Sequence, residues 1–386
     1  MVTTDPPADN NRGGDFDVIR AKGQEIRVTR GEIFENKLID VSTGESVFLR
    51  VTGGNSVIRN IGFKGLYRGD QFLISVDAGR GYVRFENIYL GDGATKEGSS
   101  SAHGPGAIYL HRGNEADVTF QRCNVQGFPN NGFHCSNTAS GSGSVHFDRC
   151  FGKNNGVATF RCGGGNDRIE NCVAYTDTTD YGHDDDDYLE TNGRPVWVWN
   201  GGIVTITDSH FADGPYPNAI VAGANDAPGR VSFESGGYRG HIQRATGSTV
   251  DVGPDVSNDL DLSLPDGVPT TAEGAASDGM LQPLGGKEDD SDDQFPHIIV
   301  FNGSEVDEPS SYSFEAAAAV AAVSHGTSTS DSDVVYDQPV HGLVSDAADV
   351  YLFRGNITAL SLCGDATVSI QHNVRDKIEA GGSLQS

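Results

Sequence analysis

The sequence of 386 residues is long enough for one large domain or two medium ones, and its 54 acidic and 27 basic side chains give a net charge of −27. Such a polyanion repels nucleic acid, so no nucleic-acid partner is expected. No stretch approaches the roughly 18 apolar residues of a membrane-spanning helix, so no membrane span is expected either. Glycine is abundant (51 residues) and long helical periodicity is lacking, which indicates an all-β or repeat protein.

The kinds of charged residue point to a high-salt environment. The chain has 38 Asp but 16 Glu, and 20 Arg but 7 Lys. A preference for Asp over Glu and for Arg over Lys is typical of protein surfaces in molar salt. There the screening length falls to about 3 Å, so the many acidic side chains hardly repel one another. An ordinary acidic protein is the alternative. We expect a halophilic protein that is extracellular or lies on a virion surface.

Residues 1–17 form an expected N-terminal tail. They lack the basic start and the apolar run of a signal peptide. Either the numbering begins after processing, or the protein reaches its destination without a secretion signal, as a virion component would.

A repeat of short strands fills residues 18–250. Its strands alternate inward apolar and outward polar residues, then bend at two polar residues, then resume the alternation. The first inward column is Ile58, Phe85, Phe120, Phe147, Ile169 and Ile206. The second, three residues later, is Ile61, Ile88, Cys123, Cys150, Cys172 and Ser209.

A third strand precedes the pair of strands that carries the two inward columns, which gives three strands per coil of 22 or more residues. These further strands are expected at 47–51, 72–76, 107–111, 132–136, 158–162, 196–200 and 218–222. Self-similarity of this kind marks a solenoid, so the repeat predicts a parallel β-helix. The stacked cysteines, with Cys135 and Cys162 in another column, are expected to be reduced core residues; disulfides are the alternative.

Two stretches carry a family resemblance. Residues 33–51 (IFENKLIDVSTGESVFLRV) and 59–65 (RNIGFKG) resemble the opening coils of right-handed parallel β-helix proteins of the pectate-lyase-like superfamily. Haloarchaeal members, among them virus-encoded spike, turret or surface proteins, are the most similar in character. The resemblance covers residues 18–250 and implies the fold; the scaffold itself hosts lyases, hydrolases, tailspikes and inert surface proteins.

The remaining chain divides into two expected parts. Residues 251–294 are acidic and poor in periodicity, and they are expected to be a solvated linker. Strand signals return over 295–386. That segment resembles a small C-terminal β module found behind haloarchaeal β-helix proteins, which implies a β-sandwich-like unit for anchoring, oligomerisation or binding.

Insertions in the repeat indicate one functional edge. The two largest, 91–105 and 176–195, follow the same strand of their coils and are expected about 14 Å apart from the strand spacing. Shorter loops at 126–131 and 212–217 occupy the same place. Aromatic faces stack on sugar rings while carboxylates accept hydrogen bonds from sugar hydroxyl groups. The candidate glycan-binding residues on this edge are Phe128, Tyr181, Tyr188, Glu190 and Tyr216.

The acidic stretch 181–190 (YGHDDDDYLE) lies in the second insertion. In extended chain Asp184 and Asp186 point the same way and offer a weak cation site, so calcium is the alternative to no cofactor. Glycoside hydrolysis needs a carboxyl with a raised pKa, and exposed aspartates lack the apolar pocket for it. A lyase needs a base such as Arg161, Arg168 or Arg194, but no motif marks them. We expect an exposed insertion without catalytic residues.

The functional expectation is a non-enzymatic surface protein. It is a virion spike, turret or adhesin that presents the loop edge to a host cell-surface glycan and assembles with itself and with other virion or surface proteins. The alternatives are a tailspike-like polysaccharide lyase or glycoside hydrolase acting at the same edge, and a purely architectural capsid or surface-layer element.

Overall fold

The chain forms two compact units, Met1–Leu284 and Gly285–Ser386, in a computed structural model. In the first unit the structure describes residues 16–136, 143–164, 166–178, 180–182, 193–199, 201–224 and 227–277. In the second unit it describes residues 297–303, 310–316, 320–325, 328–329, 335–336, 340–344, 348–353 and 357–371.

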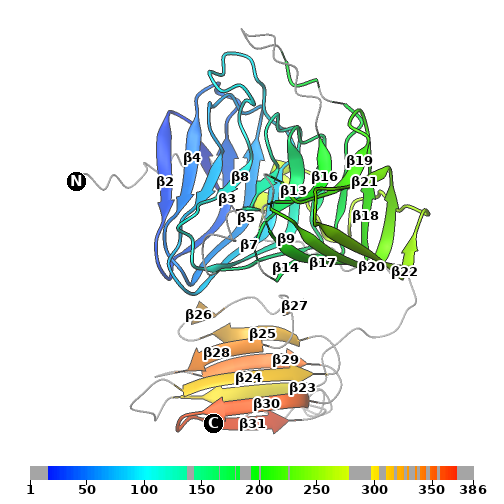
Figure 1. The fold of residues 1–386 in the computed structure, drawn as a ribbon. Helices are drawn as coiled ribbons and strands as arrows, with labels where there is room; N and C mark the ends of the chain where they lie inside the picture. The colour runs from blue at the N-terminus through cyan, green and yellow to red at the C-terminus, as the bar shows by residue number, and fades with distance from the viewer. Residues whose placement is uncertain are drawn as a thin grey trace, which may run out of the picture. The chain divides into compact units, whose positions relative to one another are not determined.

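The first unit is a parallel β-helix, as predicted (Figure 1). Within the described residues, two long sheets run along it. The 13-stranded sheet contains β1 (Asp17–Arg20), β3 (Ile33–Asp40), β5 (Ser56–Lys64), β7 (Tyr82–Leu90), β9 (Asp117–Gln126), β11 (Val145–Asp148), β12 (Phe151–Lys153), β14 (Asp167–Glu170), β15 (Val173–Tyr175), β17 (Ile203–Thr207), β18 (Ser209–Ala212), β20 (Arg230–Arg239) and β22 (Thr249–Ser257). The nine-stranded sheet contains β2 (Gln24–Val28), β4 (Val47–Val51), β6 (Ile74–Val76), β8 (Ile108–Leu110), β10 (Phe133–His134), β13 (Ala158–Cys162), β16 (Arg194–Val198), β19 (Asn218–Ala222) and β21 (His241–Arg244).

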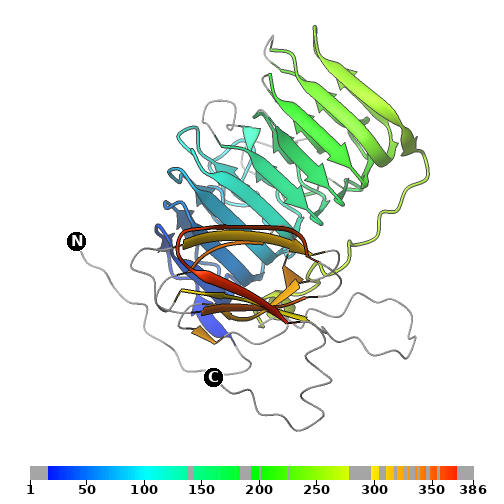
Figure 2. The same cartoon turned by 90° about the horizontal axis from the view of Figure 1, so that it is seen from below.

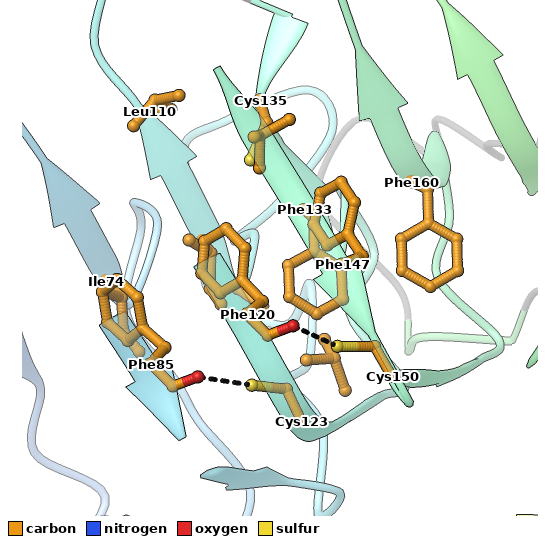
Figure 3. Close-up of a cluster of buried hydrophobic side chains, with 14 of the residues drawn as sticks. Ile74, Phe85, Leu110, Phe120, Cys123, Phe133, Cys135, Phe147, Cys150 and Phe160 are labelled. Atoms are coloured by element: carbon orange, nitrogen blue, oxygen red, sulfur yellow. Dashed lines mark hydrogen bonds between the residues drawn. The ribbon is translucent and has the colours of Figure 1, made fainter. Parts of the chain in front are cut away.

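The predicted inward column is confirmed. Phe85, Phe120 and Phe147 are fully buried and pair in register across β7, β9 and β11. Their rings stack with centroids 4.9 and 5.3 Å apart, close to the spacing of neighbouring strands. Phe133 and Phe160 of the opposite sheet pack against them and close the core (Figure 3).

The bend between the two inward columns depends on left-handed backbone. Asn60 and Asn87 have φ of 55°, and Arg122 has φ of 52°. Asparagine tolerates this region better than other residues with side chains. The side-chain Nδ2 of Asn87 donates to Asn60 Oδ1 at 2.9 Å, and Nδ2 of Asn60 donates to Asn36 Oδ1 at 2.8 Å. The sequence pattern predicted a bend at two polar residues but not its left-handed backbone. The recurring asparagine at the second of these positions was the signal for that conformation.

The cysteine column is reduced, as expected. Cys123, Cys150 and Cys172 are free and fully buried. The Cys150 amide donates to Cys172 Sγ at 3.3 Å, and the Cys150 thiol donates to the Phe120 carbonyl oxygen at 3.2 Å (Figure 3). Neighbouring coils are therefore joined at these cysteines by hydrogen bonds and not by disulfide bonds. Cys135 and Cys162 are also free and buried.

The expectation of a solvated linker from residue 251 is wrong for its first part. Residues 251–257 belong to β22, which pairs with β20 in the 13-stranded sheet. Residues 258–277, here called the strap, then run back along that sheet (Figure 2). Leu262 and Leu264 pack against Phe151 and Val173, which the acidic composition of this segment obscured.

The strap ends in the helix α1 (Ala272–Ala276), which lies on the early coils. Its alanines pack against Leu38 and Tyr89. The N-cap Thr271 accepts a hydrogen bond from the Gly274 amide at 2.9 Å, which satisfies one free amide of the first turn. The rest of the expected linker, residues 278–294, lies outside the described residues.

The second unit consists of small antiparallel sheets, as expected for the C-terminal module. Its described strands are β23 (His297–Asn302), β24 (Ser310–Ala316), β25 (Val320–His325), β26 (Ser328–Thr329), β27 (Val335–Tyr336), β28 (Val340–Val344), β29 (Ala348–Phe353), β30 (Ile357–Cys363) and β31 (Thr367–Gln371). Phe301 stacks on Tyr312 with centroids 3.8 Å apart. The Tyr312 hydroxyl donates to the buried Asp349 carboxylate at 2.6 Å, which solvates that charge inside the core.

Candidate functional site

The two large insertions meet each other directly. The Lys96 amide donates to the carbonyl oxygen of Tyr181 at 2.9 Å, and Thr95 Oγ1 donates to the same oxygen at 3.1 Å. The described parts of both insertions are therefore in contact at Tyr181, although the repeat alone predicted about 14 Å between them.

Two candidate residues that were expected on an exposed edge are buried. Tyr181, whose carbonyl oxygen contacts the first insertion, is only 7% exposed, and Phe128 is 1% exposed because its loop turns the ring into the core beside Leu73 and Leu90. Neither ring is open to a sugar. Tyr216 is half-buried, and its hydroxyl donates to Gln243 Oε1 at 3.1 Å.

The remaining candidates, Tyr188, Glu190, Asp184 and Asp186, lie outside the described residues, and the glycan and cation roles expected of them stay predictions. Across the described part of the chain, no group of three or more His, Cys, Asp or Glu side chains is placed to hold a metal ion.

A different surface gathers the side chains suited to recognition: the outer face of the nine-stranded sheet. Each central strand buries two apolar residues and turns the one between them outward, as strand geometry requires. In β13, for example, Phe160 and Cys162 are fully buried while Arg161 is half-buried. The register aligns the outward residues of six strands in one row: Arg50, Ser75, Tyr109, His134, Arg161 and Trp197.

One end of this row is a cation–aromatic stack, formed by Arg161, Arg194, Trp197, Trp199 and Tyr216. The Cζ atom of Arg161 lies 4.7 Å from the ring centroid of Trp197 and 4.1 Å from that of Trp199. Arg194 Cζ lies 4.2 Å from Trp197 and 4.7 Å from Tyr216. The two indole rings meet edge to face at 4.7 Å. Guanidinium groups and rings thus alternate across three coils, each attracted by the quadrupole of its neighbour.

The middle of the row is an aromatic cluster of Phe72, Tyr109, His111 and His134. Tyr109 lies 5.2 Å from Phe72 and 4.9 Å from His134 between ring centroids. Gly106 makes room for this arrangement, since a Cβ there would come within 2.2 Å of the Phe72 ring. The cluster adjoins the stack because His134 pairs with Arg161 across β10 and β13.

The positive charge of this face resides on its arginines. Burial and the like charge of Arg194 together lower the pKa of Arg161 to about 10, so the guanidinium stays charged at neutral pH. Burial, with the charges of Arg161 and Arg112, lowers the pKa of His134 to about 3, so that imidazole is neutral. Among the described residues, the Arg161 side chain forms no hydrogen bond or ion pair, and Nδ1 of His134 has no hydrogen-bond partner.

Sequence reasoning missed this face because it considered the inward columns and the loop edge but not the outward residues of the strands. The signal was present in the alternation of residues 196–200 (VWVWN), which places both tryptophans on one side of a strand whose other side is core. The register then brings Arg161 from the preceding coil beside them.

Comparison with known proteins adds no relative: no family model, no curated protein and no solved structure matches this chain. Among the described residues, no helix has the length and apolar character needed to cross a membrane.

Proposed function

We propose that this protein is a non-enzymatic surface protein that binds a glycan along the outer face of its nine-stranded sheet. The cation–aromatic stack carries the proposal. Tryptophan, tyrosine and arginine dominate recognition surfaces because they combine a large rigid contact area with polar groups. Indole and phenol faces pack against the CH groups of a pyranose ring, while guanidinium N–H groups donate to its oxygens.

The shape of the face also supports a chain-like ligand. Its outward residues repeat once per coil, so equivalent contacts recur along the β-helix. The aromatic cluster and the cation–aromatic stack adjoin along this direction and would contact successive units of one polymer. The binding surface thereby moves from the loop edge, where Phe128 and Tyr181 are buried, to the sheet.

The biological setting is proposed from composition. An excess of Asp over Glu and of Arg over Lys favours a halophilic protein on a cell or virion surface. A spike, turret or adhesin of haloarchaeal type, assembled with copies of itself or with other surface proteins, fits both this composition and a solenoid that displays one long face.

A second candidate function is a polysaccharide lyase acting on the same face. The observation in its favour is Arg161, whose pKa of about 10 makes it a better proton acceptor than an ordinary arginine. A glycoside hydrolase would instead need a pair of carboxyl groups, and neither the stack nor the aromatic cluster contains one.

Binding to haloarchaeal exopolysaccharide in molar salt tests the proposal. We expect Trp197→Ala to weaken binding about tenfold or more, the loss typical of a central aromatic residue. Tyr82→Ala is the matched control, because Tyr82 is exposed and lies 5.7 Å from an arginine, Arg84, on the other sheet. Equal binding by both variants and the wild type would contradict the proposal, and unsaturated sugar products at wild-type concentration would favour the lyase.

A further inference from the structure

Resting on the proposed function, a second step concerns the kind of glycan. We propose that the glycan is acidic and that a carboxylate or sulfate group on one of its sugars binds Arg161 beside Trp197 and Trp199.

The first argument is the missing counter-ion. Other arginines of this chain have carboxylate partners: Arg59 with Glu35 at 2.6 Å, and Arg149 with Asp148 at 2.7 Å. Arg161 has none among the described residues, although acidic residues outnumber basic ones two to one in the whole chain. Burial costs a guanidinium part of its hydration, and a bound anion would compensate that loss more fully than aromatic rings do.

The second argument is the contact geometry. The rings of Trp197 and Trp199 lie 4.7 and 4.1 Å from Arg161 Cζ, so both contact the guanidinium. Aromatic rings attract the cation, but they supply no oxygen for its N–H donors. A carboxylate or sulfate presents several oxygens to the guanidinium fork and can accept two parallel hydrogen bonds.

The third argument is the concentration of positive charge. Arg161 and Arg194 share the ring of Trp197, at 4.7 and 4.2 Å, and Arg112 lies close enough to act on the pKa of His134. Like charges placed this close repel one another, and a bound anion would relieve that repulsion. A neutral glycan would leave it in place.

The overall charge of −27 does not oppose this choice in concentrated salt. At about 1 M ionic strength the screening length is about 3 Å, so distant carboxylates hardly repel an approaching anion. A contact ion pair held by a half-buried guanidinium is screened much less. Local complementarity at Arg161 then decides which glycan binds.

The test compares native haloarchaeal exopolysaccharide with two modified forms, one with its carboxyl groups reduced to alcohols and one desulfated. Titration calorimetry in molar salt measures each affinity. We expect the wild type to bind the native polymer about tenfold more tightly than one of the modified forms, and that form identifies the anion as carboxylate or sulfate. Arg161→Gln should lose this preference, so that its affinities for the native and the modified polymer agree within about twofold.

The control variant is Arg84→Gln, which removes an arginine beside Tyr82 on the other sheet and should keep the preference. Equal wild-type affinity for all three polymers would overturn the acidic ligand while leaving glycan binding intact. No binding to any of them would contradict the proposed function itself. Displacement of the polymer by a single-stranded oligonucleotide at equal concentration would also overturn the inference, since stacked aromatics with arginine suit nucleobases as well. The wild-type comparison decides the matter even if Arg161→Gln does not fold.

Discussion

Gly62 lies directly against the backbone of Ala272, so close that a Cβ atom at Gly62 would come within 1.8 Å of the Ala272 carbonyl oxygen. This contact joins β5 to α1, two elements that are far apart in the sequence. It requires glycine for lack of space, because the obstructing atoms belong to backbone and cannot rotate away. The end of the strap is therefore fitted to one particular coil.

Gly62→Ala should destabilise the β-helix by roughly 1–3 kcal/mol, because the added methyl group pushes α1 off Leu38 and Tyr89. Chemical denaturation in molar salt measures this free energy. Gly79→Ala is the matched control: nothing lies within 4 Å of a Cβ there, and its effect should stay within about 0.5 kcal/mol. Equal stability of the two variants would show that α1 does not pack where the structure places it.

Thiol accessibility checks the cysteine columns. In native protein a thiol reagent should modify Cys363 alone, since that thiol is exposed and the other five are buried. After denaturation all six should react, because none is in a disulfide. Cys363→Ser should leave the native protein unreactive. Rapid native modification of Cys123, Cys150 or Cys172 would contradict their interior position.

Acidification should destabilise the protein through His134. Its pKa is lowered to about 3 in the folded state, against about 6.5 when unfolded, so the unfolded chain binds the proton more tightly. The contribution of this neutral imidazole is present above pH 6.5 and declines as the pH falls towards 3. We expect a loss on the order of 1–2 kcal/mol between pH 6.5 and 5.

The control for this pH dependence is a pair of substitutions. His134→Gln should flatten the decline between pH 6.5 and 5, whereas His241→Gln, at an exposed position of β21, should leave it unchanged. Denaturant unfolding curves at several pH values measure both. If His134→Gln kept the full slope, the proton would be taken up elsewhere.

Low salt should unfold the protein or dissociate its assemblies. The net charge of −27 is a repulsion that dilute buffer does not screen, since the screening length grows from about 3 Å at 1 M to about 10 Å at 0.1 M. We expect the native state to be lost below a few tenths molar NaCl, as followed by circular dichroism and light scattering. The same melting temperature at about 0.1 M and 3 M would remove the halophilic interpretation.

The sequence predicted the interior of the β-helix well, because inward positions recur with period two and those of the first column hold large apolar residues. Phe85, Phe120 and Phe147 were placed correctly for that reason. The strap was missed because Leu262 and Leu264 are surrounded by aspartates in the sequence. Their role as packing residues becomes visible only from their contact with the cluster around Phe151. The contact between Arg161 and Trp197 in the proposed site could not be predicted for another reason. These residues become neighbours only through the register between β13 and β16.

The strap also changes how the coils depend on one another. In a simple solenoid each coil contacts only its neighbours, so the terminal coils can fray one at a time. Here the chain leaves the last coil, passes Phe151 and Val173 of the middle coils, and fastens to Leu38 near the beginning. The carbonyl oxygens of Pro269 and Ala275 accept hydrogen bonds from Asn124 and Asn87, which ties the strap to two further coils. Opening of the last coil would therefore remove the strap from the surface of coils several layers away. Protection from amide hydrogen exchange should then be lost over the whole β-helix at once, rather than progressively from its C-terminal end.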